Sequence, residues 1–128
     1  MKQMILPPPL KALLPADIQC HCEGAFFKKN ERVFLAGKKP AWMFYVVSGE
    51  LILERTGLHG ESVVLQRIRQ GFISEASLKV AAYHCDAIAM VDTTVIQIPV
   101  KALTQSLEHD PAFASRWISM LNTEVTRP

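Results

Sequence analysis

The chain has 128 residues, of which 49% are hydrophobic, and a formal net charge of +2 at neutral pH. This length is typical of one domain, and the apolar fraction is sufficient to build a hydrophobic core. The basic residues are scattered along the chain, which argues against direct nucleic-acid binding, because such proteins usually carry a basic stripe or a larger excess of charge.

Residues 1–15 do not have the pattern of a signal peptide, because Pro7 and the two prolines after it interrupt the apolar run. No window approaches the ~18 apolar residues that a membrane-spanning helix needs. The three cysteines, Cys20, Cys22 and Cys85, do not make a disulfide framework, and the first two are too close together to bridge easily. We therefore expect a cytoplasmic protein with reduced thiols and no membrane partner.

The chain divides into three parts by residue pattern. Residues 10–22 carry leucines at helical spacing, and Pro15 divides them into two short helical segments. Residues 24–99 contain short runs rich in β-branched and aromatic residues, and glycines such as Gly49 and Gly71 separate them. Many short strands with regular turn signals predict a small sandwich, barrel or roll.

Residues 100–126 are helical again. Asp110 and Pro111 have the residue types expected at the N-cap and the first position of a helix. Apolar residues then recur at spacings of three and four, which indicates an amphipathic helix. The main members of this stripe are Phe113, Trp117, Met120 and Leu121.

This order of elements resembles the cyclic-nucleotide-binding sensor domain of CRP/FNR-type bacterial transcription regulators. Three segments carry the resemblance: YVVSGELIL at residues 45–53, RIRQGFISEASL at residues 67–78 and DPAFASRW at residues 110–117. The resemblance implies a mainly β fold with flanking helices, namely a double-stranded β-helix, or jelly roll, followed by a dimerisation helix. It also implies one domain over residues 1–128, with a short cassette helix near residues 74–79. The helix-turn-helix DNA-binding domain of the family is absent from this chain.

In nucleotide-binding relatives, the cassette helix and an arginine hold the phosphate, and a glutamate binds the ribose. Glu75 matches that glutamate, but Cys85 stands at the arginine position and is followed by Asp86. Two carboxylates about 4 Å apart repel by ~4 kcal/mol at an effective dielectric constant of 20. We therefore expect a pocket that does not bind cyclic AMP. Its predicted residues are Gly71, Phe72, Ile73, Ser74, Glu75, Ala76, Ser77, Cys85, Asp86 and Ala87.

Other cations do not replace the missing arginine in this prediction. Lys79 is expected to be solvated or paired with Glu75, four residues earlier on the cassette helix. Arg67 and Arg69 lie on a predicted strand and face the side opposite Ile68, because side chains alternate along a strand. We expect that side to be exposed.

Two other classes of function remain as alternatives. A haem, metal or redox sensor could use His84 and Cys85, or Cys20 and Cys22. Neighbouring strand residues point to opposite faces, however, and zinc sites usually contain C-x₂-C pairs, so we expect no cofactor and no metal. A cupin-like enzyme is the second alternative, but the histidines do not form the H-x-H pair of cupin metal sites.

The sequence therefore predicts a non-enzymatic effector-sensing and dimerisation domain. Its expected partners are an unidentified small-molecule effector and a second copy of the chain. DNA would be reached only through a domain that this chain lacks. The predicted dimer interface contains Phe113, Trp117, Met120 and Leu121. In the competing arrangement, Trp117 packs against its own roll and the chain is a monomer.

Overall fold

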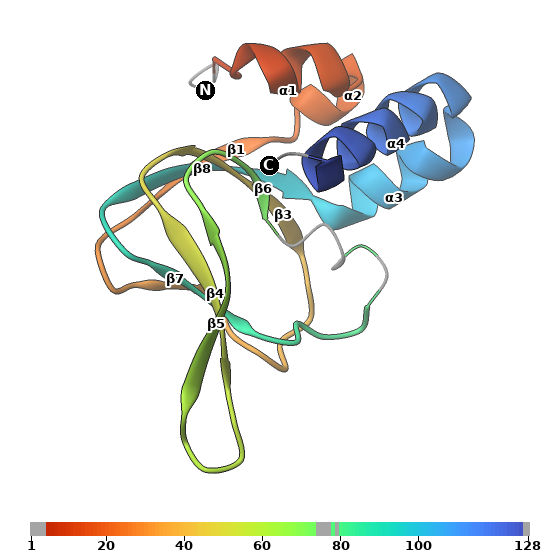
Figure 1. Cartoon of the computed structure of the whole chain (residues 1–128). Coiled ribbons are helices and arrows are strands. Elements are labelled where there is room, and N and C mark those ends of the chain that lie inside the picture. Colours follow the sequence, from red (N-terminus) through yellow and green to blue (C-terminus); the bar gives the residue numbers. More distant parts are fainter. Residues whose placement is uncertain (1–4, 74–77, 79, 127–128) are drawn as a thin grey trace.

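The computed structural model describes residues 5–73, 78 and 80–126, with residues 123–126 as backbone only (Figure 1). Two short helices precede the strands, and two longer helices follow them. The elements in chain order are α1 (Pro8–Leu13), α2 (Ala16–Gln19), β1 (Glu23–Phe27), β2 (Arg32–Phe34), β3 (Trp42–Ser48), β4 (Leu51–Thr56), β5 (Ser62–Ile68), β6 (Gly71–Ile73), β7 (Asp86–Ala89), β8 (Thr93–Pro99), α3 (Val100–His109) and α4 (Pro111–Thr126).

The strands form two antiparallel sheets. The first sheet has the order β1-β8-β3-β6, and the second has the order β2-β7-β4-β5. Strand β3 is central in the first sheet and pairs Tyr45 with Ile96 of β8 on one side and with Phe72 of β6 on the other. Sequence-distant strands are thus brought side by side, as in a roll.

Two hydrophobic cores lie on opposite sides of the first sheet. Strand β3 serves both, because Met43 and Tyr45 face the helices whereas Phe44 and Val46 face the second sheet. The core between the sheets, called the interior core, contains Phe34, Phe44, Val46, Leu51, Leu53, Ile68, Ile73, Tyr83, Cys85, Ala87, Ala89 and Val95. The core under the helices, called the helix-side core, contains Leu6, Leu10, Leu13, Leu14, Ile18, Cys22, Met43, Tyr45, Phe72, Ile96, Ile98, Leu103, Phe113 and Trp117.

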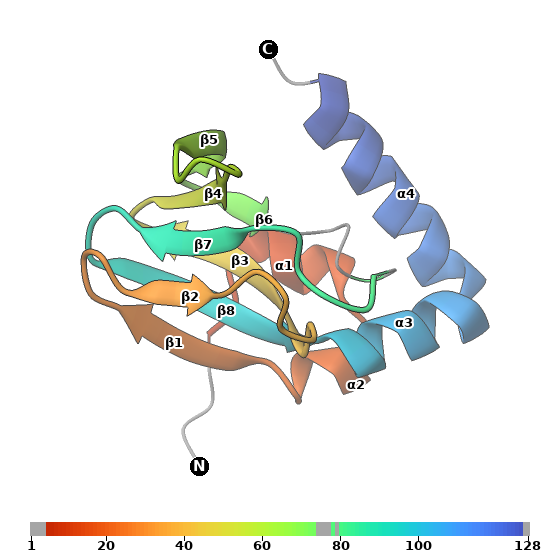
Figure 2. The same cartoon turned by 90° about the horizontal axis from the view of Figure 1, so that it is seen from below.

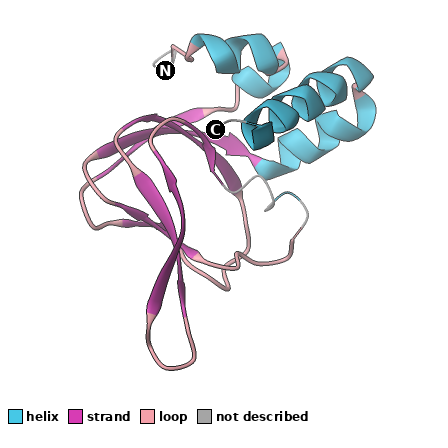
Figure 3. Ribbon diagram, in the orientation of Figure 1, coloured by secondary structure: helices cyan, strands magenta, loops and turns pink. Residues whose placement is uncertain are grey.

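The helices gather on one side of the sheets, and the β4–β5 hairpin projects on another (Figures 1 and 3). Seen from below, α3 continues from the end of β8, and α4 then runs away from the sheets toward the C-terminus (Figure 2). No helix within the described residues has the length and apolar character needed to cross a membrane.

Helix α4 begins as the sequence predicts. The Asp110 carboxylate accepts a hydrogen bond from the Phe113 amide at 3.0 Å, which satisfies one of the free N–H groups of the first turn. Pro111 occupies the first helical position, where its missing N–H is not needed. This cap sets the rotation of α4, so that Phe113 and Trp117 point into the helix-side core.

Candidate functional site

Strand β6 leads into the predicted ligand cassette, and its side chains alternate between the two cores. Gly71 opens the strand with a φ of 111°, a backbone conformation that favours glycine. Phe72 then points into the helix-side core and Ile73 into the interior core. The next four predicted cassette residues lie outside the described residues: Ser74, Glu75, Ala76 and Ser77. The ribose-binding role of Glu75 therefore stays a prediction, as does the cassette helix.

Cys85 lies at the point where the resemblance expects the phosphate-binding cation. Its side chain is 9% exposed and packs in the interior core with Ala87 and Ala89. Burial raises the pKa of the Cys85 thiol, whereas the smaller charge effects are a decrease from Arg55 and an increase from Asp86. The thiol is therefore uncharged at neutral pH, and this position offers an anion no positive partner.

Asp86 points to the other face of β7, and our expectation for it was wrong. Its carboxylate forms an ion pair with Arg32 of β2 and accepts a hydrogen bond from the Ala36 amide at 2.7 Å. Within β7, strand alternation buries Ala87 and Ala89 and turns Asp86 outward, and Cys85, just before the strand, is buried as well. Asp86 is thus a compensated structural charge that ties β2 to β7, and it does not add an unpaired carboxylate to the pocket.

The space between the sheets near Cys85 is filled by a stack of aromatic rings. The rings of Phe34 and Tyr83 lie 3.8 Å apart and almost parallel, and Phe44 extends the stack at 5.8 Å from Phe34. The Tyr83 hydroxyl donates to the Trp42 carbonyl at 3.2 Å. Burial raises the pKa of this hydroxyl, so it remains a donor at neutral pH. The chain's own side chains therefore occupy the interior core.

The loop before β3 holds this aromatic stack in place. The Tyr83 amide donates to the Lys38 carbonyl at 2.9 Å, and the Tyr83 carbonyl accepts from the Gly37 amide at the same distance. A hollow of about 420 Å³ beside the stack is lined in part by Arg32, Lys38 and Lys39. All three cations are exposed, and Arg32 is paired with Asp86, so their charges lie at the rim and not in the interior. Sequence reasoning missed these cations.

Arg67 and Arg69 do not supply a cation to the interior either. Both pair with Glu50, at 3.0 and 2.8 Å, and both are exposed, whereas Ile68 between them is buried. The hydrogen bond from Arg69 lowers the pKa of Glu50, and Arg67 adds to this effect. The predicted alternation of this strand is confirmed.

The match to a known family covers most of the roll. Residues 25–110 match the model of the cyclic nucleotide-binding domain. The chain belongs to the cyclic nucleotide-binding domain family. No curated protein matches the full sequence closely enough to add a second line of comparison.

Solved structures of several transcription regulators share the fold of this cyclic nucleotide-binding domain. The sensor domain of the regulator DNR from Pseudomonas aeruginosa matches with a TM-score of 0.76 at 20% identity, over 91% of this chain and 82% of that chain. Full DNR matches with a TM-score of 0.80 at 20% identity, over 91% and 54% of the two chains. The Thermus thermophilus catabolite activator protein gives a TM-score of 0.71 at 20% identity, over 93% and 58%.

The predicted mainly β jelly roll with flanking helices is confirmed by these matches. The chain spans only a little over half of the length of the two full regulators, at 54% and 58%. The likeness therefore concerns the fold of the cyclic nucleotide-binding domain.

The predicted dimer residues of this cyclic nucleotide-binding domain are divided by the structure. Phe113 and Trp117 are 0% and 4% exposed and pack in the helix-side core, where the Trp117 ring lies 5.3 Å from that of Phe72. Both side chains are therefore covered within the same chain, as in the competing arrangement in which Trp117 packs against its own roll, and their part in a dimer interface stays a prediction. Met120 and Leu121 are half-buried against the same core, whereas Ile118, on the outer side of α4, is 58% exposed.

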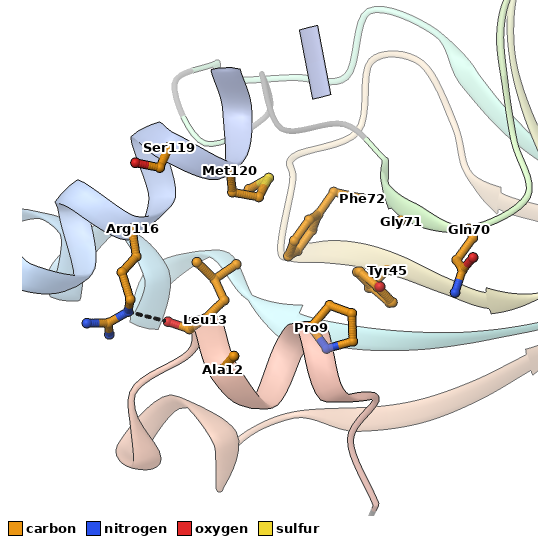
Figure 4. A pocket seen from close by; sticks show the side chains of 10 residues that line it. All are labelled: Pro9, Ala12, Leu13, Tyr45, Gln70, Gly71, Phe72, Arg116, Ser119 and Met120. Atoms are coloured by element: carbon orange, nitrogen blue, oxygen red, sulfur yellow. Dashed lines mark hydrogen bonds between the residues drawn. The ribbon is translucent and has the colours of Figure 1, made fainter. Parts of the chain in front are cut away.

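A second cavity lies outside the roll, between α1, α4 and the edge of the first sheet (Figure 4). Its volume is about 440 Å³, within the usual range of small-molecule pockets, roughly 300–1,000 Å³. Arg116 is its charged member, and its Nε donates to the Leu13 carbonyl at 3.2 Å. The lining residues are Pro9, Ala12, Leu13, Tyr45, Gln70, Gly71, Phe72, Arg116, Ser119 and Met120. Of these, Gly71 and Phe72 were predicted ligand-binding residues, and Met120 was predicted for the dimer interface.

The cysteines and histidines are not arranged as ligands in the part of the chain that the structure describes. No group of three His, Cys, Asp or Glu side chains there could hold a metal ion. His84 is exposed while Cys85 is buried, and both lie in the bend before β7. Cys20 is exposed, and Cys22 is buried with a pKa raised to about 11, chiefly by burial and further by Cys20. These observations give the metal and haem alternatives no support.

Proposed function

We propose that this domain is the effector-sensing half of a CRP/FNR-type transcription regulator and that its effector is not a cyclic nucleotide. The family match and the fold of the regulators support the sensing role. They also favour a regulatory function over an enzymatic one. The proposal places the chain in the bacterial cytoplasm, where its free thiols would stay reduced.

The observation that carries this proposal is the interior core around Cys85. A cyclic nucleotide brings a phosphate anion, and burying an anion without a cation or hydrogen-bond partner is strongly unfavourable. Cys85 supplies a neutral thiol at the expected cation position. The stacked Phe34 and Tyr83 rings also occupy volume that a ligand between the sheets would need. Charge and space therefore both oppose nucleotide binding.

Calorimetric titration with cyclic AMP and cyclic GMP tests this proposal. We expect no binding heat at nucleotide concentrations of up to about 1 mM, because even a single lost charge-assisted contact weakens binding by roughly tenfold or more. A micromolar dissociation constant for either nucleotide would refute the proposal. The Thermus catabolite activator protein can be titrated in parallel to report how a full-length relative by fold behaves under the same conditions.

We further propose that signals leave the domain through α4. This helix contacts α1 and α3 and extends beyond the sheets to the last described residues (Figure 2). A ligand that changes its orientation would move whatever part of a regulator follows it. Such a change needs an effector that binds the two orientations with different affinity.

A further inference from the structure

We propose that the cavity between α1, α4 and β6 binds a small carboxylic acid with an apolar body. This inference rests on the proposed sensing function and names its ligand class. The site is distinct from the space between the two sheets, because it lies on the opposite side of the first sheet, under the helices (Figure 4).

The apolar part of the ligand is specified by the walls of the cavity. Phe72 and Tyr45 come from the sheet, Leu13 from α1 and Met120 from α4, and Figure 4 shows their side chains around one common space. The rings of Tyr45 and Phe72 meet edge to face at 5.1 Å, so this wall is rigid. The unbranched Met120 side chain can adapt to the shape of a ligand. An apolar ring or chain would be desolvated on three sides here.

The charge of the ligand is specified by Arg116. Of the ten side chains drawn around the cavity, Arg116 is the charged one, so the described part of the lining carries one positive charge and no carboxylate. Its Nε is held by the Leu13 carbonyl at 3.2 Å, and its guanidinium lies 5.7 Å from the centre of the Phe113 ring. A guanidinium presents a planar fork of N–H groups whose geometry suits a carboxylate.

The same contacts exclude other classes of ligand. A cationic ligand would be repelled by Arg116. A nucleotide with several phosphates would bring more negative charge than one guanidinium can balance. Gln70 lies at another edge of the cavity and carries a neutral side-chain amide that suits a further hydroxyl or carbonyl (Figure 4). One carboxylate on an apolar body therefore matches the lining.

A ligand in this position would join elements that are distant in sequence. Its apolar body would touch α1 and β6, and its carboxylate would touch α4 at Arg116. Because α4 leads away from the roll, occupancy of the cavity would set the angle at which it leaves. The site is therefore placed to convert ligand binding into a change in helix orientation.

Tryptophan fluorescence provides the test, because Trp117 lies 5.3 Å from Phe72 in the cavity wall. In a Trp42→Phe background, Trp117 is the remaining tryptophan. The probes are 2-naphthoate and decanoate, each compared with its neutral alcohol, 2-naphthalenemethanol and decanol. We expect at least one carboxylate to shift the Trp117 emission with a dissociation constant below about 1 mM, and to bind more tightly than its alcohol.

Three variants locate the binding. Arg116→Gln should weaken carboxylate binding by about tenfold and leave alcohol binding unchanged. Ala12→Met should abolish both, because its side chain would fill the cavity from α1. The matched control is Ala16→Met, which introduces the same side chain at an exposed position outside the lining and should bind as the parent does.

Several results would overturn the inference: no response to either carboxylate, equal affinity for acid and alcohol, or binding that survives Ala12→Met. Cyclic AMP is titrated in the same series. Nucleotide binding would refute the proposed function, whereas a lack of carboxylate binding would refute only this site, so the two failures are distinguishable.

Discussion

Cys85 supplies no positive charge to the interior core, and replacing it with arginine tests how much a buried charge at this position lowers stability. We expect Cys85→Arg to destabilise the domain by roughly 3–5 kcal/mol, because a guanidinium would be buried among apolar residues without a partner. Urea denaturation measures this loss. Cys20→Arg is the matched control at an exposed position and should change stability little. An unchanged midpoint for Cys85→Arg would show that the interior already accommodates a cation.

Cys22 makes stability depend on alkaline pH. Its pKa is raised from 9.0 to about 11 in the folded chain, so between these values the unfolded thiol ionises while the folded one stays protonated. The unfolded state then binds fewer protons, and stability falls as pH rises from about 9 to 11. A shift of this size corresponds to a loss on the order of 2–3 kcal/mol over that range.

Denaturation midpoints at pH 8 and pH 10.5 test this expectation. Cys22→Ala should flatten the alkaline decrease, and Cys20→Ala should leave it as it is. The buried Tyr83 and Cys85 also have raised pKa values and will contribute part of the slope. A parent protein equally stable at both pH values would contradict the burial of these groups.

Sequence patterns predicted those residue features that depend only on neighbouring positions in the chain. Arg67 and Arg69 alternate with Ile68, and Asp110 caps α4, because each feature depends on a few neighbouring residues. Asp86 was misassigned because its partner, Arg32, lies 54 residues away. No local pattern reveals such a pairing, and it also depends on the register of β2 against β7.

At the scale of elements, the main difference between expectation and structure is in α4. The apolar stripe was read correctly, and packing of Trp117 on its own roll, which was the competing arrangement, is what the structure has. Phe113 and Trp117 pack on their own chain because the apolar face of the first sheet must be shielded from water, and the six-residue helix α1 is too short to shield it alone. Strand β3 is a second case in which the sequence does not identify the packing partner. It is buried on both faces, so its residues do not alternate between apolar and polar, and the sequence does not tell which core each side chain enters.

The remaining exposed side of α4 is where we expect dimerisation. Ile118 is 58% exposed, and Leu121 lies one turn further along the helix. Burying a large apolar side chain contributes ~1.5–3 kcal/mol. In a two-fold symmetric dimer, each such side chain is buried once on each subunit and so counts twice. Association itself costs at least ~4 kcal/mol. The expected dimer is therefore of micromolar affinity.

Sedimentation velocity between about 1 and 200 μM tests the dimer, a range that brackets micromolar dissociation constants. Ile118→Asn should shift the protein to monomer, whereas Ala112→Asn, at an exposed position about 120° around the same helix from Ile118, should not. A parent protein that is monomeric throughout would remove this interface and leave the carboxylate site untouched.

At the scale of the whole molecule, the charge distribution predicts no specific DNA binding by residues 1–128. The net charge is +2, and the described arginines Arg32, Arg67 and Arg69 are paired with carboxylates. A gel-shift assay at 50 and 200 mM salt should show at most a weak complex that disappears at the higher salt concentration. A discrete complex that resists salt would mean that the roll itself reads DNA.

The aromatic stack of Phe34, Tyr83 and Phe44 also limits how this protein can evolve. Regaining a nucleotide effector would require both an emptier interior and a new cation, which are changes at separate positions. An emptier interior alone lowers stability by leaving a cavity, and a new cation alone lowers it by burying a charge. Neither change alone is sufficient to bind a nucleotide. On the proposed function, a mutational route to nucleotide binding would therefore cross an intermediate that is less stable and does not yet bind the nucleotide, and the packing of the core would oppose each single step.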